Sequence, residues 1–319
     1  MTDSVYISVI NHILIQEDLG EGVYIIPNHK NHNFPSIKLT NNQDVIKSLV
    51  TPNLKPLIGQ LEYENFFKPN TLIVYSKSQF DETKTNSIDY LDLNFYLIRI
   101  FFLCLWLVKD NSIDFDLGFL YYSDAKSGFT TSSNIFSSSN FTCHGNRELI
   151  TFSTEEIKNA TNTLQENIII EKQSHKIGNL NGFGRVGIAI YFIQHARSCS
   201  DLGLKMTSYC SSLETLFSND NTELSHKLAE RVAHFLSQKK EKRIDIFKQM
   251  KKAYDFRSKV IHGTIFKSEQ EKEIECLIIE IDSICREIIK YAIEKNDMEN
   301  VFIWPNEKHE KYFLELIMS

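Results

Sequence analysis

The pattern of apolar and polar positions changes near residue 147. Before it, short runs typical of β-strands alternate with turns that contain Asn and Pro. After it, apolar residues recur at the spacing of amphipathic helices. The pattern predicts an α+β protein, with a mixed α/β N-terminal domain over 1–147 and an all-α domain over 148–319. The β-like runs are Val23–Ile26, Ser36–Leu39 and Leu72–Tyr75.

Ser, Thr, Gly and Asn dominate the stretch from Ser123 to Asn146. These residues favour a loop over a packed element. We therefore expect this stretch to be the connection between the two domains.

Four apolar stripes predict helices in the second domain. The first follows Ser153 and Glu156, whose S-x-x-E spacing is that of a capping box. Together the stripes predict a helical bundle. They are Ile157, Ala160, Leu164 and Ile168; Met206, Tyr209, Cys210, Leu213, Leu216 and Phe217; Leu224, Leu228, Val232 and Phe235; and Ile274, Leu277, Ile278, Ile281, Ile284 and Ile288.

The longest apolar run, Phe95–Val108, has 14 residues and contains Arg99. A membrane span needs about 20 apolar residues, so the run predicts a buried helix. The first ten residues carry no Lys or Arg, unlike a secretory signal. We expect a cytoplasmic protein that does not bind a membrane.

The 319 residues carry a formal charge of −6, which excludes a protein that coats nucleic acid along its whole surface. The stretch Lys239–Lys259 differs, since nine basic and three acidic residues give it +6 and leave −12 on the rest. Such a local basic strip can hold a phosphate backbone at one place. The alternative is an exposed amphipathic face.

The sequence from Lys239 to Gly263 predicts one helix, with Gly263 as the residue that follows its C-cap. Arg257 lies on the helix's apolar stripe. A guanidinium there must pair with an acid, receive an anion or lie at the edge of an interface. The stripe consists of Phe247, Met250, Tyr254 and Ile261.

His262 lies in the last turn of this helix, where the helix dipole favours a protonated imidazole suited to proton transfer. The step of five residues from Arg257 turns the two side chains about 140° apart. They therefore diverge within one chain, although two copies related by a twofold axis could bring both pairs into one cleft. The alternative is a capping histidine at a solvated helix end.

The spacing of Arg257 and His262, R-x4-H, resembles the motif of ribonucleases in the HEPN superfamily. Three blocks together resemble its Apea-like group, in order and in spacing. Ser258 departs from the Asn, Asp or His that often follows the arginine in the superfamily. The blocks are Ser212–Phe217 (SLETLF), Glu223–Leu236 (ELSHKLAERVAHFL) and Tyr254–Gly263 (YDFRSKVIHG).

The resemblance implies a HEPN helical bundle that cleaves RNA, often tRNA, without a metal or another cofactor. His262 would transfer the proton while a 2′-hydroxyl attacks the adjacent phosphorus, and Arg257 would stabilise the phosphorane charge. Asp255 and Ser258 are candidate supporting residues, although Asp255 is better placed to pair with a neighbouring Arg or Lys than with His262. Three lysines are candidate RNA ligands: Lys251, Lys252 and Lys259.

The resemblance further implies a homodimer with a shared site and a role in prokaryotic anti-phage defence by abortive infection. Residues 1–147 resemble no family, and we expect them to be a sensor or substrate-selecting module that binds a regulatory or phage-derived partner. The alternative function is a HEPN module that binds RNA, a nucleotide or a protein without cleavage.

Other motifs are weaker. Gly182–Gly187 matches G-x-G-x-x-G but follows a polar stretch instead of a strand, so we interpret it as a loop before a helix at 188–197. The six cysteines contain no C-x2-C pair, which argues for free thiols and against a zinc site. Cys210, Cys276 and Cys285 are expected in the core.

Overall fold

The computed structural model describes residues 2–26, 35–80, 87–124, 128–167, 184–219, 224–264, 268–295 and 298–318. The protein is mixed α+β, with a helical C-terminal region, as the sequence predicts. It divides into two compact units. The first unit comprises residues 1–140 and 147–165, and the second comprises 141–146 and 166–319.

The first unit is built on an antiparallel sheet with the strand order β3-β4-β5-β1-β6-β7. A short parallel pair, β2 with β8, lies outside it. The strands are β1 (Thr2–Ile10), β2 (Ile13–Leu14), β3 (Val23–Ile26), β4 (Ile37–Thr40), β5 (Leu72–Phe80), β6 (Phe115–Asp124), β7 (Gly128–Ser138) and β8 (Ile150–Thr151). The helices are α1 (Gln43–Leu49), α2 (Lys55–Ile58), α3 (Gln60–Asn65), α4 (Ser87–Val108) and α5 (Thr154–Asn167), with a 3-10 turn η1 (Pro52–Leu54).

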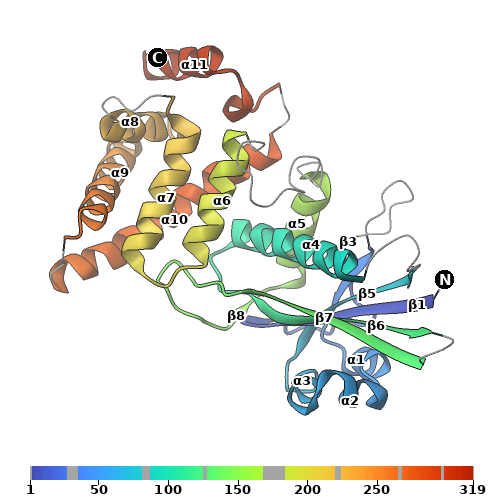
Figure 1. The fold of residues 1–319 in the computed structure, drawn as a ribbon. Coiled ribbons are helices and arrows are strands. Elements are labelled where there is room, and N and C mark those ends of the chain that lie inside the picture. Colours follow the sequence, from blue (N-terminus) through green and yellow to red (C-terminus); the bar gives the residue numbers. More distant parts are fainter. Residues whose placement is uncertain are drawn as a thin grey trace. The chain divides into compact units, whose positions relative to one another are not determined.

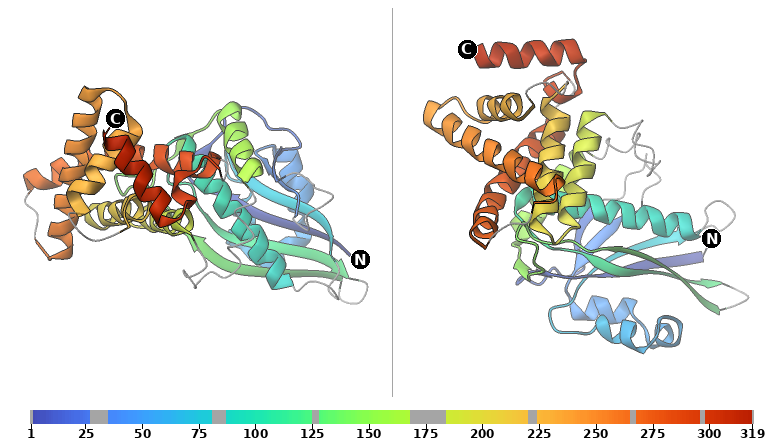
Figure 2. Two further views of the ribbon diagram at one scale, coloured as in Figure 1. Left: turned by 90° about the horizontal axis from the view of Figure 1, so that it is seen from above. Right: turned by 60° about the vertical axis from the view of Figure 1, so that its left-hand side comes forward.

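Both faces of the sheet are covered, α4 lying on one face and α1 to α3 on the other (Figures 1 and 2). Successive residues of a strand point to opposite faces. Tyr6 accordingly packs edge-on against Phe95 of α4. Its neighbour Ile7 joins the buried cluster that contains Ile46 and Leu49 of α1. Neighbouring side chains of β1 are thus buried on opposite faces of the sheet.

Helix α4 confirms the buried helix predicted at Phe95–Val108 and extends it back to Ser87. It is long and apolar enough to cross a membrane by length and composition, but 67% of its most apolar window is buried within the protein. Gly118 of β6 permits its close packing, because a Cβ there would lie 2.8 Å from both Phe95 and Tyr6.

The prediction of a loop between Ser123 and Asn146 is wrong for residues 128–138. These residues form strand β7, which pairs with β6. The serine content suggested a turn, but the stretch also contains the strand-favouring residues Thr130, Thr131 and Ile135. Pairing with a neighbouring strand overrides the weak local preference of serine.

The predicted domain boundary at residue 147 also differs from the structure, because residues 147–165 belong to the first unit. Strand β8 pairs with β2, and the Lys109 Nζ at the end of α4 lies 2.7 Å from a carboxylate oxygen of Glu156 in α5. The Ser153–Glu156 capping box is confirmed, with Glu156 N–H donating to Ser153 Oγ at 3.2 Å and Ser153 N–H to Glu156 Oε2 at 2.9 Å.

The described residues of the second unit from 184 onward form helices and one 3-10 turn. Helix α7 packs against α6, α8, α9 and α10. The apolar stripes predicted for α7 and α10 are buried throughout, whereas Ile168 of the first stripe lies outside the described residues. The elements are α6 (Arg185–Arg197), α7 (Leu202–Phe217), α8 (Leu224–Leu236), α9 (Lys240–Ile261), α10 (Ser268–Glu294), η4 (Val301–Ile303) and α11 (Asn306–Met318).

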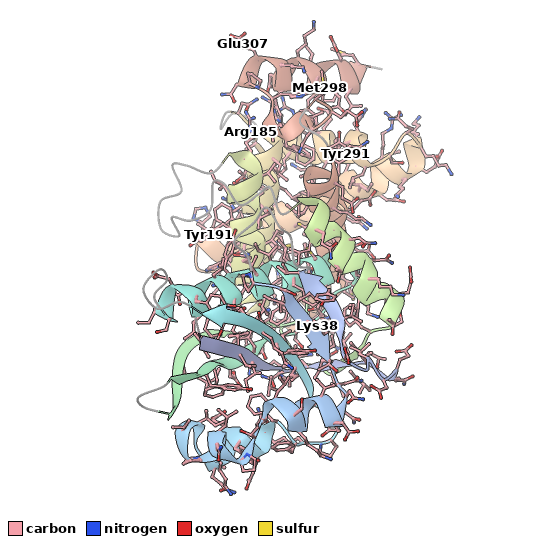
Figure 3. All side chains as sticks on the ribbon, turned by 90° about the vertical axis from the view of Figure 1, so that its right-hand side faces the viewer. Lys38, Arg185, Tyr191, Tyr291, Met298 and Glu307 are labelled. Carbon is pink, nitrogen blue, oxygen red and sulfur yellow. The ribbon has the colours of Figure 1, made fainter. Side chains whose placement is uncertain are left out.

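Side chains from α8 and α11 satisfy the last carbonyl groups of α7. His309 Nε2 lies 2.8 Å from the Leu216 carbonyl oxygen, and Arg231 Nη1 donates to that of Phe217 at 2.6 Å. Arg231 also pairs with Glu310. Helix ends otherwise leave such acceptors without partners. Arg185, at the start of α6 (Figure 3), donates to the Trp304 carbonyl at 3.0 Å and fixes the segment before α11.

The buried His309 predicts a pH dependence of stability. Burial, aided by the charge of Arg185, lowers its pKa from 6.5 to about 4. The unfolded chain therefore binds a proton below pH 6.5 that the folded chain does not, so stability falls as pH decreases toward 4. Between pH 7.5 and 5 we expect His309 to account for a loss of about 2 kcal/mol.

The measurement is urea unfolding of the parent and of His309→Gln, in which an amide can still donate to the Leu216 carbonyl. The parent should lose more stability than the variant between pH 7.5 and 5. Parallel pH profiles for the two proteins would contradict the assignment.

Candidate functional site

Helix α9 carries the predicted site, but its buried face differs from the predicted stripe. Met250 is buried as expected, whereas Phe247 and Tyr254 are only half-buried and Ile261 is 54% exposed. The predicted stripe would suit a helix that packs against one partner, but α9 packs against three helices, α7, α8 and α10. The buried residues of α9 are Ile246, Met250, Ala253 and Phe256.

Arg257 points into the bundle and pairs with an acid, one of the three roles that its position allowed. Its Nη2 lies 3.4 Å from each carboxylate oxygen of Glu214 on α7, and its Nη1 donates to the Tyr254 hydroxyl at 3.0 Å. The side chains of Arg257 and Glu214 are 23% and 19% exposed. Part of the Arg257 side chain therefore remains accessible, although its Nε is buried.

The pKa shifts around Arg257 follow from burial. Burial raises the pKa of Glu214, opposed by the charge of Arg257 and by the hydrogen bond from Tyr254. Burial and the neighbouring Glu214 carboxylate raise the pKa of Tyr254 to about 12. Tyr254 therefore keeps its proton at neutral pH. Its hydroxyl accepts a hydrogen bond from the Arg257 guanidinium and donates one to the Glu214 carboxylate.

The thiol of Cys210 lies beside this group on α7. Burial, with the charge of Glu214, raises its pKa to about 12, so it remains a thiol rather than a nucleophile. All six cysteines are free, as predicted. Cys210 and Cys285 are buried as expected, but Cys276 is exposed because it lies away from the buried stripe of α10.

His262 is the C-cap of α9 and its side chain is exposed. Gly263 follows with φ of 69°, a left-handed conformation that glycine adopts without strain. Its N–H donates to the Val260 carbonyl at 3.0 Å, and that of Thr264 to the Lys259 carbonyl at 2.9 Å. These bonds form a Schellman motif, which confirms the predicted helix end. Within the described residues the His262 imidazole makes no hydrogen bond.

One protomer does not bring the two candidate catalytic groups together. The Arg257 guanidinium contacts α7, whereas the His262 imidazole is exposed at the end of α9. This arrangement agrees with the divergence that their spacing predicts. The described residues contain no group of three His, Cys, Asp or Glu side chains placed to hold a metal ion.

The supporting residues have local roles. Asp255 Oδ2 lies 2.6 Å from Lys259 Nζ, the pairing predicted for it. The Ser258 carbonyl accepts the backbone N–H of His262 at 3.1 Å. Ser258 thus contributes to the helix end through its backbone.

The three lysines predicted to bind RNA differ in their contacts. Lys252 Nζ pairs with Glu273 on α10 at 3.0 Å, and Lys259 pairs with Asp255. Lys251 Nζ instead donates to the neutral hydroxyl of Ser225 on α8 at 3.0 Å. Two of the three charges are therefore offset by carboxylates within the protomer.

Sequence reasoning missed Glu214 and assigned Tyr254 only to the apolar stripe. The signal for Glu214 was present, because it is a charged residue in the mostly apolar turn Leu213–Phe217. A second signal was Arg257 itself, because a guanidinium on a packed helix face needs an acidic partner.

Gly203, near the start of α7, lets the end of α9 approach. A Cβ at this position would lie 2.8 Å from Val260 Cγ2. Overpacking costs about 1–3 kcal/mol, while Ala gains at most about 1 kcal/mol over Gly in a helix. We expect Gly203→Ala to destabilise the protein by about 1 kcal/mol in urea unfolding. Val260→Ala should recover part of this loss when the two are combined, and strictly additive effects would contradict the contact.

Comparisons with family models, with curated proteins and with solved structures find no match for this chain. The resemblance to HEPN ribonucleases therefore depends on the residues of the chain itself.

Proposed function

We propose that the protein is a metal-independent endoribonuclease of the HEPN type. The observation that carries the proposal is the end of α9, where Arg257 is held in place by Glu214 and Tyr254 while His262 is exposed at a well-formed helix cap. A positioned cation and an accessible imidazole are the groups that phosphodiester cleavage needs. The proposed bundle is the HEPN bundle of the Apea-like group.

In the proposed reaction, the 2′-oxygen attacks the adjacent phosphorus and the bond to the 5′-oxygen breaks. The 2′-hydroxyl loses its proton, the 5′-oxygen gains one, and the products carry a cyclic phosphate and a 5′-hydroxyl. His262 transfers one of these protons, and solvent water transfers the other. Arg257 uses one N–H of each terminal nitrogen for Tyr254 and Glu214, which leaves the second N–H of each for a phosphorane oxygen.

The proposed site is completed by a second copy of the chain. Because the two groups diverge within one protomer, a twofold axis near the end of α9 would place the Arg257 of one protomer near the His262 of its partner. Dimerisation would then be a condition for activity.

The proposed setting is prokaryotic anti-phage defence in the cytoplasm, where the nuclease cuts cellular or phage RNA such as tRNA. The first unit would then be the sensor or substrate-selecting module, which binds a regulatory or phage-derived partner. The division of the chain into two compact units supports only the separate module in this proposal.

The Arg257–Glu214 ion pair favours a second candidate, a module that binds RNA, a nucleotide or a protein without cleavage. In this candidate the pair is structural, since the carboxylate already offsets the charge of the guanidinium. The two functions differ in whether RNA is cut.

The experiment is incubation of the purified protein with total RNA and with tRNA in EDTA. A double variant, Arg257→Ala with His262→Ala, is prepared and assayed in parallel. The nuclease proposal expects fragments with cyclic phosphate and 5′-hydroxyl ends from the parent alone. Intact RNA with a mobility shift would favour the binding module. Cleavage that EDTA abolishes would exclude the proposed mechanism.

A further inference from the structure

Lys251 is the predicted RNA-binding lysine whose charge is not offset within the part of the chain that the structure describes. Among the described residues, no carboxylate lies within ion-pair distance of it, and its one hydrogen bond goes to the hydroxyl of Ser225. A lysine ammonium has three N–H donors. With respect to the described residues, two donors therefore remain for an anion.

Lys251 also lines an open pocket of about 510 Å³ between α8 and α9, together with Leu224, Ser225 and His226. The His226 ring packs edge-on against Phe247, with ring centroids 5.2 Å apart. This packing orients the imidazole, and Ser225 is partly buried while His226 is exposed. The pocket thus presents an ammonium, an imidazole and a hydroxyl, all of which can donate to a phosphate oxygen.

The pocket lies on the same side of α9 as His262. Lys251 and His262 are eleven residues apart, which places them within about 20° around the helix and about 17 Å apart along it. Arg257, by contrast, lies about 120° away from Lys251.

We propose that Ser225, His226 and Lys251 form a subsite for a backbone phosphate of a single RNA strand whose cleaved bond lies at His262. The choice of RNA as ligand rests on the proposed function. The subsite sets the register of the strand and does not take part in bond cleavage. Lys252 and Lys259, which pair with carboxylates, contribute less to RNA affinity.

The test measures the affinity of single-stranded RNA for protein carrying His262→Ala, which leaves the RNA uncut. Lys251→Met in that background should weaken binding about 5- to 10-fold and reduce the slope of log K against log salt by about 0.7. Lys251→Arg should retain most of the affinity. Lys248→Met is the matched control, because Lys248 is exposed on the same helix and does not line the pocket, and it should change affinity less than 2-fold.

Equal affinities for the Lys251→Met and Lys248→Met proteins would overturn the subsite, as would an absence of RNA binding. The cleavage assay is read separately. RNA binding that depends on Lys251 in a protein that cuts no RNA would contradict the nuclease and retain the subsite. Cleavage by a protein whose RNA affinity is insensitive to Lys251→Met would retain the nuclease and exclude the subsite.

Discussion

His262→Ala is expected to lower the rate of RNA cleavage by about 10²- to 10⁴-fold, the usual contribution of a general acid or base. Because the side chain is exposed and makes no hydrogen bond within the described residues, the variant should fold and bind RNA like the parent. Single-turnover cleavage and RNA affinity measure the two effects separately. His144→Ala, which removes another exposed histidine, is the control and should retain parent activity.

Arg257→Ala should lower the rate by about 10²- to 10³-fold through lost stabilisation of the phosphorane. It also leaves the partly buried Glu214 without its cation, so thermal unfolding must be measured beside activity. Arg257→Lys keeps the charge but cannot contact Tyr254 and Glu214 through two separate nitrogens, so it should recover only part of the rate. A His262→Ala protein that cleaves at the parent rate would exclude the proposed chemistry.

Arg231→Met is expected to destabilise the protein by about 2–4 kcal/mol, or about 3–6 °C in thermal unfolding. The Arg231 side chain is 4% exposed, and its guanidinium donates to the Phe217 carbonyl and pairs with Glu310. Methionine fills similar space but leaves the carbonyl without its donor. Because Phe217 ends the helix that carries Glu214, cleavage should also weaken.

Lys311→Met is the control for this prediction. Lys311 forms an exposed pair with Glu315 on α11, and such pairs contribute about 0–1 kcal/mol. Its unfolding temperature should therefore stay close to that of the parent. Equal effects for the two variants would contradict the role assigned to Arg231.

Local sequence patterns predicted those elements whose residues carry their own signal. The capping box at Ser153 and Glu156, the buried stripe of α7 and the glycine that ends α9 depend on neighbours within one helix. Strand β7 could not be predicted in this way, since its serines and threonines become a strand only by pairing with β6. The boundary at 147 was misplaced for the same reason, because β8 is held by β2 from the other end of the first unit.

In the candidate site, too, local spacing predicts some features, whereas others depend on contacts between distant residues. The position of Arg257 on the packed side of α9 and the place of His262 at its cap follow from helical spacing. The partner of Arg257 does not, since Glu214 lies 43 residues away and on another helix. The helical spacing indicates that Arg257 must pair with an acid, receive an anion or lie at the edge of an interface. Only the packing of α7 against α9 shows that it pairs with an acid.

The most direct test of the account is to combine two inactive proteins, Arg257→Ala and His262→Ala, by co-expression with different tags and to purify the mixed dimer. If each site takes its arginine and its histidine from different protomers, one intact site forms in each mixed dimer. The purified mixed dimer should therefore recover roughly half of the parent cleavage rate per dimer. Mixed dimers that remain as inactive as the two separate variants would contradict the shared site.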